Sequence, residues 1–272
     1  MWRCIRLKNE RYRNEWKYRI TPGEQALLRC RLRPLLTPDP HAQNGVYTIR
    51  SLYFDDFWDS AYREKEDGIC HRKKYRIRVY NFSDQTIRLE RKKKAGSYIC
   101  KEDAPLTRAQ VEDILAGRYG FLLQSPHSLC REFYIECVCH GMRPRTIVDY
   151  EREPWVYEPG QVRLTFDSSV RAAVGGWDLF DPGLPALNVL DPGTLVLEVK
   201  FTGLLPGLVR QLLPPKAAEF TALSKYVLCR EKTEYRSAPG GWTDLQGGYY
   251  EYKGRYQKIG AGRLHHRGAG PD

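Results

Sequence analysis

The chain contains a segment in which basic and apolar residues alternate with the period of a β-strand. It covers residues 72–80 and reads RKKYRIRVY. The alternating basic residues are Arg72, Lys74, Arg76 and Arg78. Apolar residues lie between them from Tyr75 onward. Because successive side chains of a strand point to opposite faces, the segment predicts one row of cations and one apolar face.

The same design recurs in distant parts of the chain. Mixed cations and carboxylates alternate with apolar residues in EWKYRI (15–20), TIRLERK (86–92), VRLTFD (162–167) and LVLEVKF (195–201). YTIRSLYFD (47–55) and RTIVDYERE (145–153) also have the composition of strands. The wet outer face of a sandwich explains one such strand, but exposed strand faces usually also carry Ser, Thr and Gln. A polar channel inside a barrel, with helices over its apolar outside, accounts for all of them.

We therefore predict an α+β fold, an antiparallel β tunnel barrel of about eight strands with flanking helices. Three helices are expected. TPGE at 21–24 is a capping box that begins a helix running to about Leu36, and TRAQ at 107–110 begins another that ends at Gly117. A third helix is predicted over residues 216–230.

No internal repeat or linker divides residues 1–236, which we predict to form one tunnel domain. Residues 237–272 are a basic tail rich in Gly and Tyr, which we expect to be flexible.

Charge and cysteine usage narrow the class of protein. The net charge is +11, from 44 Lys and Arg against 33 Asp and Glu, and much of the excess lies between residues 71 and 101. Such a field attracts nucleic acid, phosphates or acidic lipid. The eight cysteines are spread out with no signal peptide before them, which predicts reduced thiols in the cytoplasm. No run of about 20 apolar residues exists, so no transmembrane helix is expected.

A channel lined with Lys and Arg is suited to a highly charged anion. Duplex DNA is too wide for a small barrel, whereas a linear triphosphate or polyphosphate fits. Glu90 and Glu198 in such a channel indicate a divalent metal, Mg²⁺ or Mn²⁺, between carboxylate and phosphate, or else they neutralise neighbouring lysines. The sequence has no P-loop, no G-x-S-x-G motif and no HExxH motif.

From about Asn14 to Arg230 the chain resembles the VTC domain. This domain is the polyphosphate polymerase module of the CYTH-like, triphosphate tunnel metalloenzyme superfamily. The resemblance is carried, in order, by NEWKYRI, SLYFDD, YREKEDGICHRKKYRIRVY, LERK, DYERE, VRLTFD, LEVKF and LSKY. It implies a tunnel that transfers the γ-phosphate of ATP to a growing inorganic polyphosphate chain.

The resemblance also implies roles for individual residues. Glu198 matches the metal-binding glutamate. Glu90, which the charge pattern indicates and the resemblance does not, is a second candidate ligand for Mn²⁺ or Mg²⁺. Lys101 is a looser match to a phosphate-binding residue, and Tyr150 and Ser224 would contribute hydrogen bonds to the substrate. The basic residues assigned to phosphate binding and catalysis are Lys17, Arg76, Arg78, Lys92, Arg152, Arg163 and Lys225, with Lys200 added because strand geometry places it on the face of Glu198.

The sequence departs from the family pattern before LSKY, where residues 220–223 read FTAL and lack a basic residue. One contact to the phosphate chain is therefore expected to be missing. A domain with no regulatory or membrane segment beside it predicts a bacterial protein of the cytoplasm. Its expected partners are ATP and inorganic polyphosphate, without specific nucleic acid. Two alternatives stay open: a triphosphatase that uses the same tunnel and metal, and a non-catalytic module that binds polyphosphate or RNA.

Overall fold

The computed structural model describes residues 12–40, 42, 45–96, 98–214 and 223–237. The chain forms two compact units, residues 1–232 and residues 233–272. The first unit holds the whole sheet. Of the second unit, only 233–237 are described, as the end of a helix. The predicted tail therefore lies almost entirely outside the described residues.

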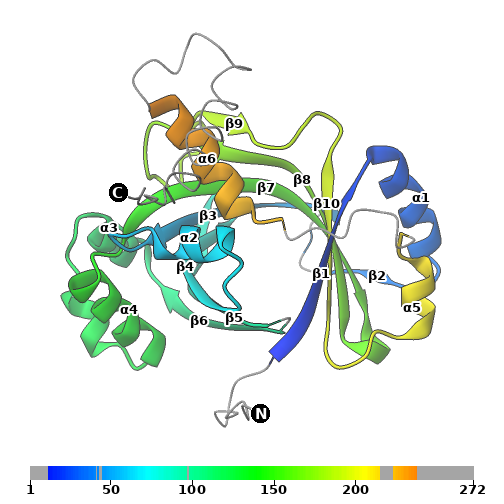
Figure 1. Ribbon diagram of the computed structural model, residues 1–272, viewed down its shortest axis with the longest axis horizontal. Coiled ribbons are helices and arrows are strands. Elements are labelled where there is room, and N and C mark those ends of the chain that lie inside the picture. Colours follow the sequence, from blue (N-terminus) through cyan, green and yellow to red (C-terminus); the bar gives the residue numbers. More distant parts are fainter. Residues whose placement is uncertain (1–11, 41, 43–44, 97, 215–222, 238–272) are drawn as a thin grey trace, which may run out of the picture. The chain divides into compact units, whose positions relative to one another are not determined.

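Ten antiparallel strands form one sheet, and eight of them close into a ring (Figure 1). The two further strands, β2 (Thr37–Pro38) and β9 (Ala186–Asn188), pair with β7 and β8. In order around the ring the strands are β7 (Arg143–Tyr157), β3 (Tyr47–Asp55), β4 (His71–Tyr80), β5 (Ser83–Ala95), β6 (Tyr98–Leu106), β1 (Tyr12–Ile20), β10 (Leu195–Phe201) and β8 (Val162–Ala173), which returns to β7. The predicted α+β fold, an antiparallel closed sheet of about eight strands with flanking helices, is confirmed.

The two capping boxes expected from the sequence are both present, at Thr21 and at Thr107. The first helix ends at Leu32 instead of near Leu36, because Pro34 has no backbone N–H to continue it. The last helix begins at Lys225, after the non-helical Ser224, and residues 216–222 of the predicted span lie outside the described residues. The helices are α1 (Pro22–Leu32), α2 (Ser60–Glu66), α3 (Arg108–Leu115), α4 (Ser128–Cys139), α5 (Gly207–Leu212) and α6 (Lys225–Ser237).

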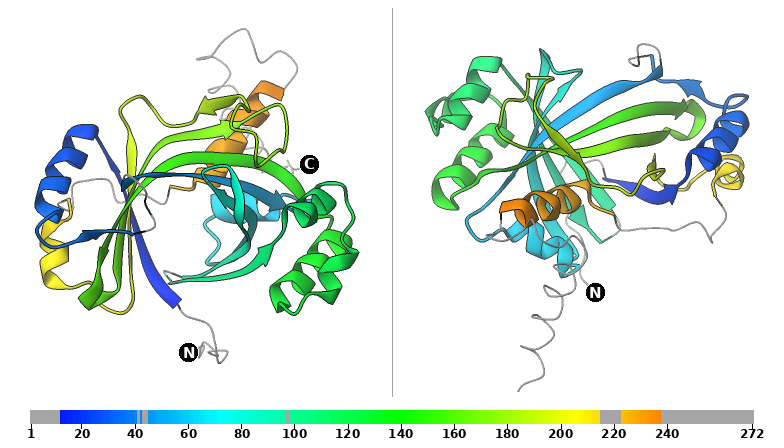
Figure 2. Two further views of the ribbon diagram at one scale, coloured as in Figure 1. Left: turned by 180° about the vertical axis from the view of Figure 1, so that it is seen from behind. Right: turned by 90° about the horizontal axis from the view of Figure 1, so that it is seen from above.

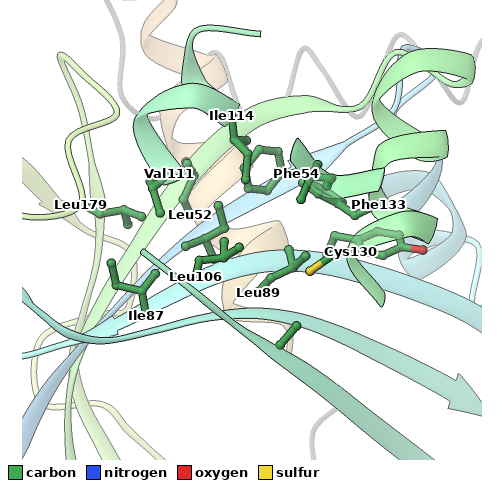
Figure 3. Close-up of a cluster of buried hydrophobic side chains, with 14 of the residues drawn as sticks. Leu52, Phe54, Ile87, Leu89, Leu106, Val111, Ile114, Cys130, Phe133 and Leu179 are labelled. Carbon is green, nitrogen blue, oxygen red and sulfur yellow. The ribbon is translucent and has the colours of Figure 1, made fainter. Parts of the chain in front are cut away.

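The apolar faces of the ring strands point outward and are covered by helices on two sides (Figures 1 and 2). On one side, α3 and α4 pack over β3 to β6, with Phe133 and Ile114 among the buried contacts to Leu52 and Leu89 (Figure 3). On the other side, α1 and α5 cover β8 and β10 through Leu32 and the side chains of a second core. These two cores hold the ring closed and leave its polar faces inside.

Part of the interior is apolar, which the sequence analysis did not predict. Tyr47, Ile49 and Val148 lie on the inner faces of β3 and β7, and Cys229 of α6 packs against them. The first turns of α6 therefore close off this part of the ring. The polar cavity occupies the remainder of the interior.

Candidate functional site

A cavity of about 420 Å³ lies inside the ring. Its walls come from β1, β3, β4, β5, β6, β7 and β10, with the start of α6 and one residue of α2 at its edges. Most of the residues singled out in the sequence line it. They are Lys17, Arg76, Arg78, Lys92, Tyr150, Arg152, Glu198, Lys200, Ser224 and Lys225. The alternating row on residues 72–80 therefore does face inward, with Arg72 and Lys74 also in the lining.

Three of the expected site residues do not line this cavity. Glu90 is almost fully buried, where it accepts hydrogen bonds from Arg76 Nε (2.7 Å) and Lys101 Nζ (2.9 Å). Lys101 therefore lies beside Glu90. Glu90 on β5 contacts Arg76 directly, and Lys101 on β6 contacts Glu90. Arg163 donates to Asp39 Oδ2 (2.7 Å) and to the Tyr47 hydroxyl (3.0 Å), outside the cavity lining.

Glu198 is a carboxylate surrounded by cations. Its Oε1 accepts from Lys225 Nζ at 2.9 Å, and its Oε2 accepts from Lys200 Nζ at 2.9 Å and from Arg152 at 3.3 Å. Lys17 Nζ lies 3.6 Å from Oε1. Burial alone would raise the pKa of Glu198, but the surrounding lysines and Arg152 hold it well below its usual range. Glu198 is therefore ionised at every pH at which the protein would work.

Two further buried carboxylates were not identified as site residues from the sequence. Asp167 is fully buried and accepts two hydrogen bonds from Arg152, at 2.6 and 2.7 Å, and one from Lys225 Nζ at 2.6 Å. Glu15 accepts from Lys92 Nζ at 2.8 and 3.0 Å. Both occupy polar positions in the alternating segments VRLTFD and EWKYRI, and that alternation was the signal that could have identified them.

Aromatic hydroxyls fix the arginines of β4. Arg76 donates to the Tyr53 hydroxyl at 2.6 Å, and Arg78 donates to the Tyr150 hydroxyl at 3.1 Å. Arg78 also bonds Ser51 at 3.0 Å. Burial would raise the pKa of Tyr53, but Arg76 and Arg78 outweigh it and lower that pKa. The guanidinium groups are therefore held in place before any ligand arrives.

The donor set suits a divalent metal only when a ligand supplies oxygens. No group of three or more His, Cys, Asp or Glu side chains in the described part of the chain could hold a metal ion. Glu198 is one cavity carboxylate, and its oxygens already contact cations. Mg²⁺ is often bound by one or two carboxylates together with substrate phosphates. Glu198 fits this arrangement, in which a carboxylate and substrate phosphates bind the ion together.

Together, the closed ring and its cation-lined interior define a class of protein that can bind a compact, strongly anionic ligand between strands. A family model, the VTC domain, matches residues 12–233. The chain belongs to this family. No helix in the described ranges is long and apolar enough to cross a membrane.

Solved structures resemble the chain at low sequence identity. One, from Hippeastrum, is described as a putative adenylyl cyclase, HpAC1, with a dominant triphosphatase activity. It is 14% identical with a TM-score of 0.50, and the match covers 82% of this chain and 96% of that one. A putative adenylate cyclase from Bacillus halodurans is 11% identical with a TM-score of 0.44, and covers 87% and 96%. A search of curated proteins gave no significant match.

Proposed function

We propose that this protein is an ATP-dependent polyphosphate polymerase, which transfers the γ-phosphate of ATP to a growing inorganic polyphosphate chain inside the ring. The observation that carries the proposal is the cavity around Glu198. Glu198 contacts Lys17, Arg152, Lys200 and Lys225, and the arginines of β4 line the same space. Asp167 and Glu15 share some of these cations. The match to the VTC domain supports the same activity.

Phosphoryl transfer depends mainly on positioning and on neutralisation of charge, and it needs little covalent help from the protein. Arg76 and Arg78 are braced by tyrosines and would hold phosphate oxygens with planar, two-pronged donors. Lys200 and Lys225 would neutralise the negative charge of the transferred phosphoryl group. A divalent ion, Mn²⁺ or Mg²⁺, would bind Glu198 together with phosphate oxygens and add positive charge there.

Binding must exchange one set of ion pairs for another. Each ammonium that contacts Glu198 or Asp167 would turn partly toward phosphate as the chain enters. The hydroxyl of Ser224 and that of Tyr150 can follow, since both line the cavity. Ser224 and Tyr150 keep their proposed roles in substrate binding. Glu90 accepts hydrogen bonds from Arg76 and Lys101, and it thereby positions Arg76.

A triphosphatase is the second candidate, because water can replace the phosphate acceptor without any change in the lining. The Hippeastrum protein, described as having a dominant triphosphatase activity, supports this alternative. The absence of a basic residue at 220–223 also favours it, although residues 220–222 lie outside the described residues. A module that binds polyphosphate without turnover is the third candidate.

One incubation separates the three candidates. Purified protein is incubated with ATP and Mn²⁺, and the products are run on a gel stained for polyphosphate while ADP and free phosphate are assayed. A polymerase gives a ladder of long anionic chains and ADP. Free phosphate without a ladder contradicts the polymerase and supports the hydrolase. Tight polyphosphate binding with neither product leaves the binding module.

A further inference from the structure

All but one of the cations that line the cavity fall into two groups. The exception is Lys74, which donates to Ser224 Oγ at 3.3 Å. In the inner group each cation has a carboxylate close by: Arg152 and Lys225 bond Asp167, Lys200 bonds Glu198, and Lys92 bonds Glu15. In the outer group, Arg72 and Lys94 form no ion pair with a carboxylate within 4.0 Å in the described part of the chain. Arg72 donates to the Ile69 carbonyl, and Glu64 attracts it from farther away. Lys65 of α2 lies beside Arg72 and Lys94, and its one near carboxylate is Glu66 at 4.0 Å. We call Lys65, Arg72 and Lys94 the rim cluster.

The rim cluster stands where the strands end. Arg72 is the second residue of β4, and Lys94 is the last residue but one of β5. A line of contacts joins it to the centre of the cavity. Glu198 bonds Lys200, Glu15 lies 4.0 Å from Lys200 and bonds Lys92, and Lys92 pairs across the strands with Lys74. Arg72 and Lys94 form the next such pair outward.

Like charges lie directly opposite each other at this end of the ring. Arg72 pairs in register with Lys94, and Lys74 pairs with Lys92. Side chains at directly opposite positions on one face are about 5 Å apart, and like charges placed there destabilise the sheet. Burial lowers the pKa of Lys94, and repulsion from Arg72 and Lys65 lowers it further. Such an arrangement has a physical reason when an anion bridges the cations.

We propose that the rim cluster is a separate subsite for the outer phosphates of a linear polyphosphate chain, and that it makes the protein prefer long chains to triphosphate. The inference rests on the proposed function, since the inner cations would hold the reacting end of the same chain. A triphosphate has enough phosphates for the inner group. Only a longer chain reaches Arg72 and Lys94 at the same time.

Polyphosphate suits this subsite better than a nucleic acid does. Its repeating unit is a bare phosphate, so successive charges are close together and no sugar or base needs room. The cavity of about 420 Å³ is already walled by Tyr53, Tyr150 and Tyr226. The ring of Tyr53 stacks on that of Tyr226, and lysine ammonium groups lie over the rings of Tyr150 and Tyr226. These rings are engaged with the protein and are not free to stack on bases.

The test compares affinities for tripolyphosphate and for long-chain polyphosphate, measured by calorimetry in EDTA so that no turnover occurs. The rim variant is Arg72→Ala with Lys94→Ala. Its matched control is Lys73→Ala with Lys93→Ala, which removes the same charge from the directly paired neighbours on the outer face. Thermal melts confirm that both variants fold. The single variant Lys94→Gln repeats the test with a smaller change should the double variant unfold.

We expect wild type and control to bind long polyphosphate more tightly than tripolyphosphate. The rim variant should lose at least about tenfold in affinity for long chains, the scale of one or two charge-assisted contacts, and keep its affinity for tripolyphosphate within about twofold. Equal losses for both ligands, or an equal loss in the control, would mean that the cations act only through a general electrostatic attraction. Either result would overturn the subsite. So would a single-stranded oligonucleotide that binds as well as polyphosphate and depends on the same residues.

Chain synthesis from ATP is followed with the same preparations. In one outcome, the wild-type protein is inactive in synthesis while the rim variant still loses affinity for long chains only. That result contradicts the polymerase and supports the subsite. Normal synthesis with no length dependence contradicts the subsite and keeps the polymerase.

Discussion

Glu198 has more cationic neighbours than one carboxylate can neutralise. Its two oxygens contact Lys200, Lys225 and Arg152, and Lys17 lies close to one of them. For simple capture of an anion this carboxylate is a disadvantage, because it competes with phosphate for the same cations. A carboxylate at this position is useful only if it has another role. The donor set allows one such role, which is to bind a divalent ion together with phosphate oxygens.

Replacement of Glu198 by Gln should therefore separate binding from turnover. We expect turnover of ATP to fall by about 100-fold or more, as for the loss of one group that stabilises charge in a transition state. Tripolyphosphate binding in EDTA should not weaken, since the cations stay. Steady-state kinetics and calorimetry check this. Glu102→Gln is the control, which removes the same charge from the outer face near Arg91. Wild-type turnover in Glu198→Gln would remove the metal role.

Lys92 gives the site a dependence on pH. Burial, together with the charges of Lys17 and Lys200, lowers the pKa of its ammonium group to about 8, although Glu15 and Glu198 offset part of the effect. Phosphate favours the protonated form, so the pKa rises on binding. Below about pH 8 Lys92 already carries its proton, and above it binding must take up a proton. Affinity for polyphosphate should therefore fall as the pH rises above 8.

The Lys92→Arg variant tests this dependence, because arginine keeps its charge throughout the range. We expect a flatter affinity profile between about pH 8 and 10 and a smaller proton uptake, measured by calorimetry in buffers of different ionisation enthalpy. The profile should become flatter without becoming level, since the pKa values of Lys74, Lys94 and Lys200 are lowered too. An unchanged profile in the variant would assign the dependence to those lysines instead.

At the scale of the element, the start of α6 brings Lys225 and the preceding Ser224 to the cavity. Tyr226 fixes the first turn of this helix. Its ring stacks on Tyr53 at 5.1 Å, and its hydroxyl donates to Asp55 Oδ2 at 2.6 Å. Asp55 also accepts from the backbone N–H groups of Ala61 and Tyr62, at the start of α2. One buried carboxylate thus joins α2 to α6 at the edge of the site.

Tyr226→Phe removes the hydroxyl and keeps the stacked ring. We expect the free energy of unfolding to fall by about 1.5–3 kcal/mol, the usual contribution of a buried hydrogen bond to a charged group, since the hydroxyl donates to Asp55 and also accepts from Arg230. Affinity for polyphosphate should fall as well, because Lys225 and Ser224 lose their fixed position. Urea unfolding and calorimetry measure the two effects. Tyr134→Phe on α4 is the matched control and should change stability by less than about 0.5 kcal/mol. A loss of stability without any loss of affinity would contradict the positioning role.

The elements that the sequence predicted well are those set by local pattern. Alternation placed Arg76 and Arg78 inside and Ile77 outside, and the capping boxes at Thr21 and Thr107 began α1 and α3 as expected. Such signals need only neighbouring residues. The helices α2, α4 and α5 have no side-chain cap and were missed.

Contacts made by closure of the ring could not be predicted in this way. Arg163 lies on the expected inner face, opposite Lys200, but its partner Asp39 comes from a distant segment of the chain. Likewise, the apolar group around Ile49 and Cys229 forms only when α6 packs against the inner faces of β3 and β7. A single strand does not reveal which side chain will face it across the ring.

At the scale of the whole tunnel unit, residues 12–232, closure has an electrostatic consequence. Strands far apart in the sequence bring their polar faces into one small volume, and the cations there outnumber the carboxylates. Ion pairs compensate the inner group, whereas the rim cluster and Lys74 keep their repulsion. The free protein is therefore less stable than the same fold would be with an anion inside. A multivalent anion is bound more tightly by the folded state, because the unfolded chain has no cavity that brings these cations together.

Tripolyphosphate should raise the melting temperature of the protein in a dose-dependent manner. Linkage gives a stabilisation of about 2.7 kcal/mol at a concentration 100 times the dissociation constant. Differential scanning calorimetry in EDTA measures the shift without turnover. Added salt should reduce the shift, because it screens the charges that draw the ligand in. Chloride and sulfate at matched ionic strength are the controls, and they should give far smaller shifts because they cannot span several cations of the cavity at once. An equal shift with sulfate would mean that the interior responds to ionic strength alone, and it would contradict a cavity built for linked phosphates.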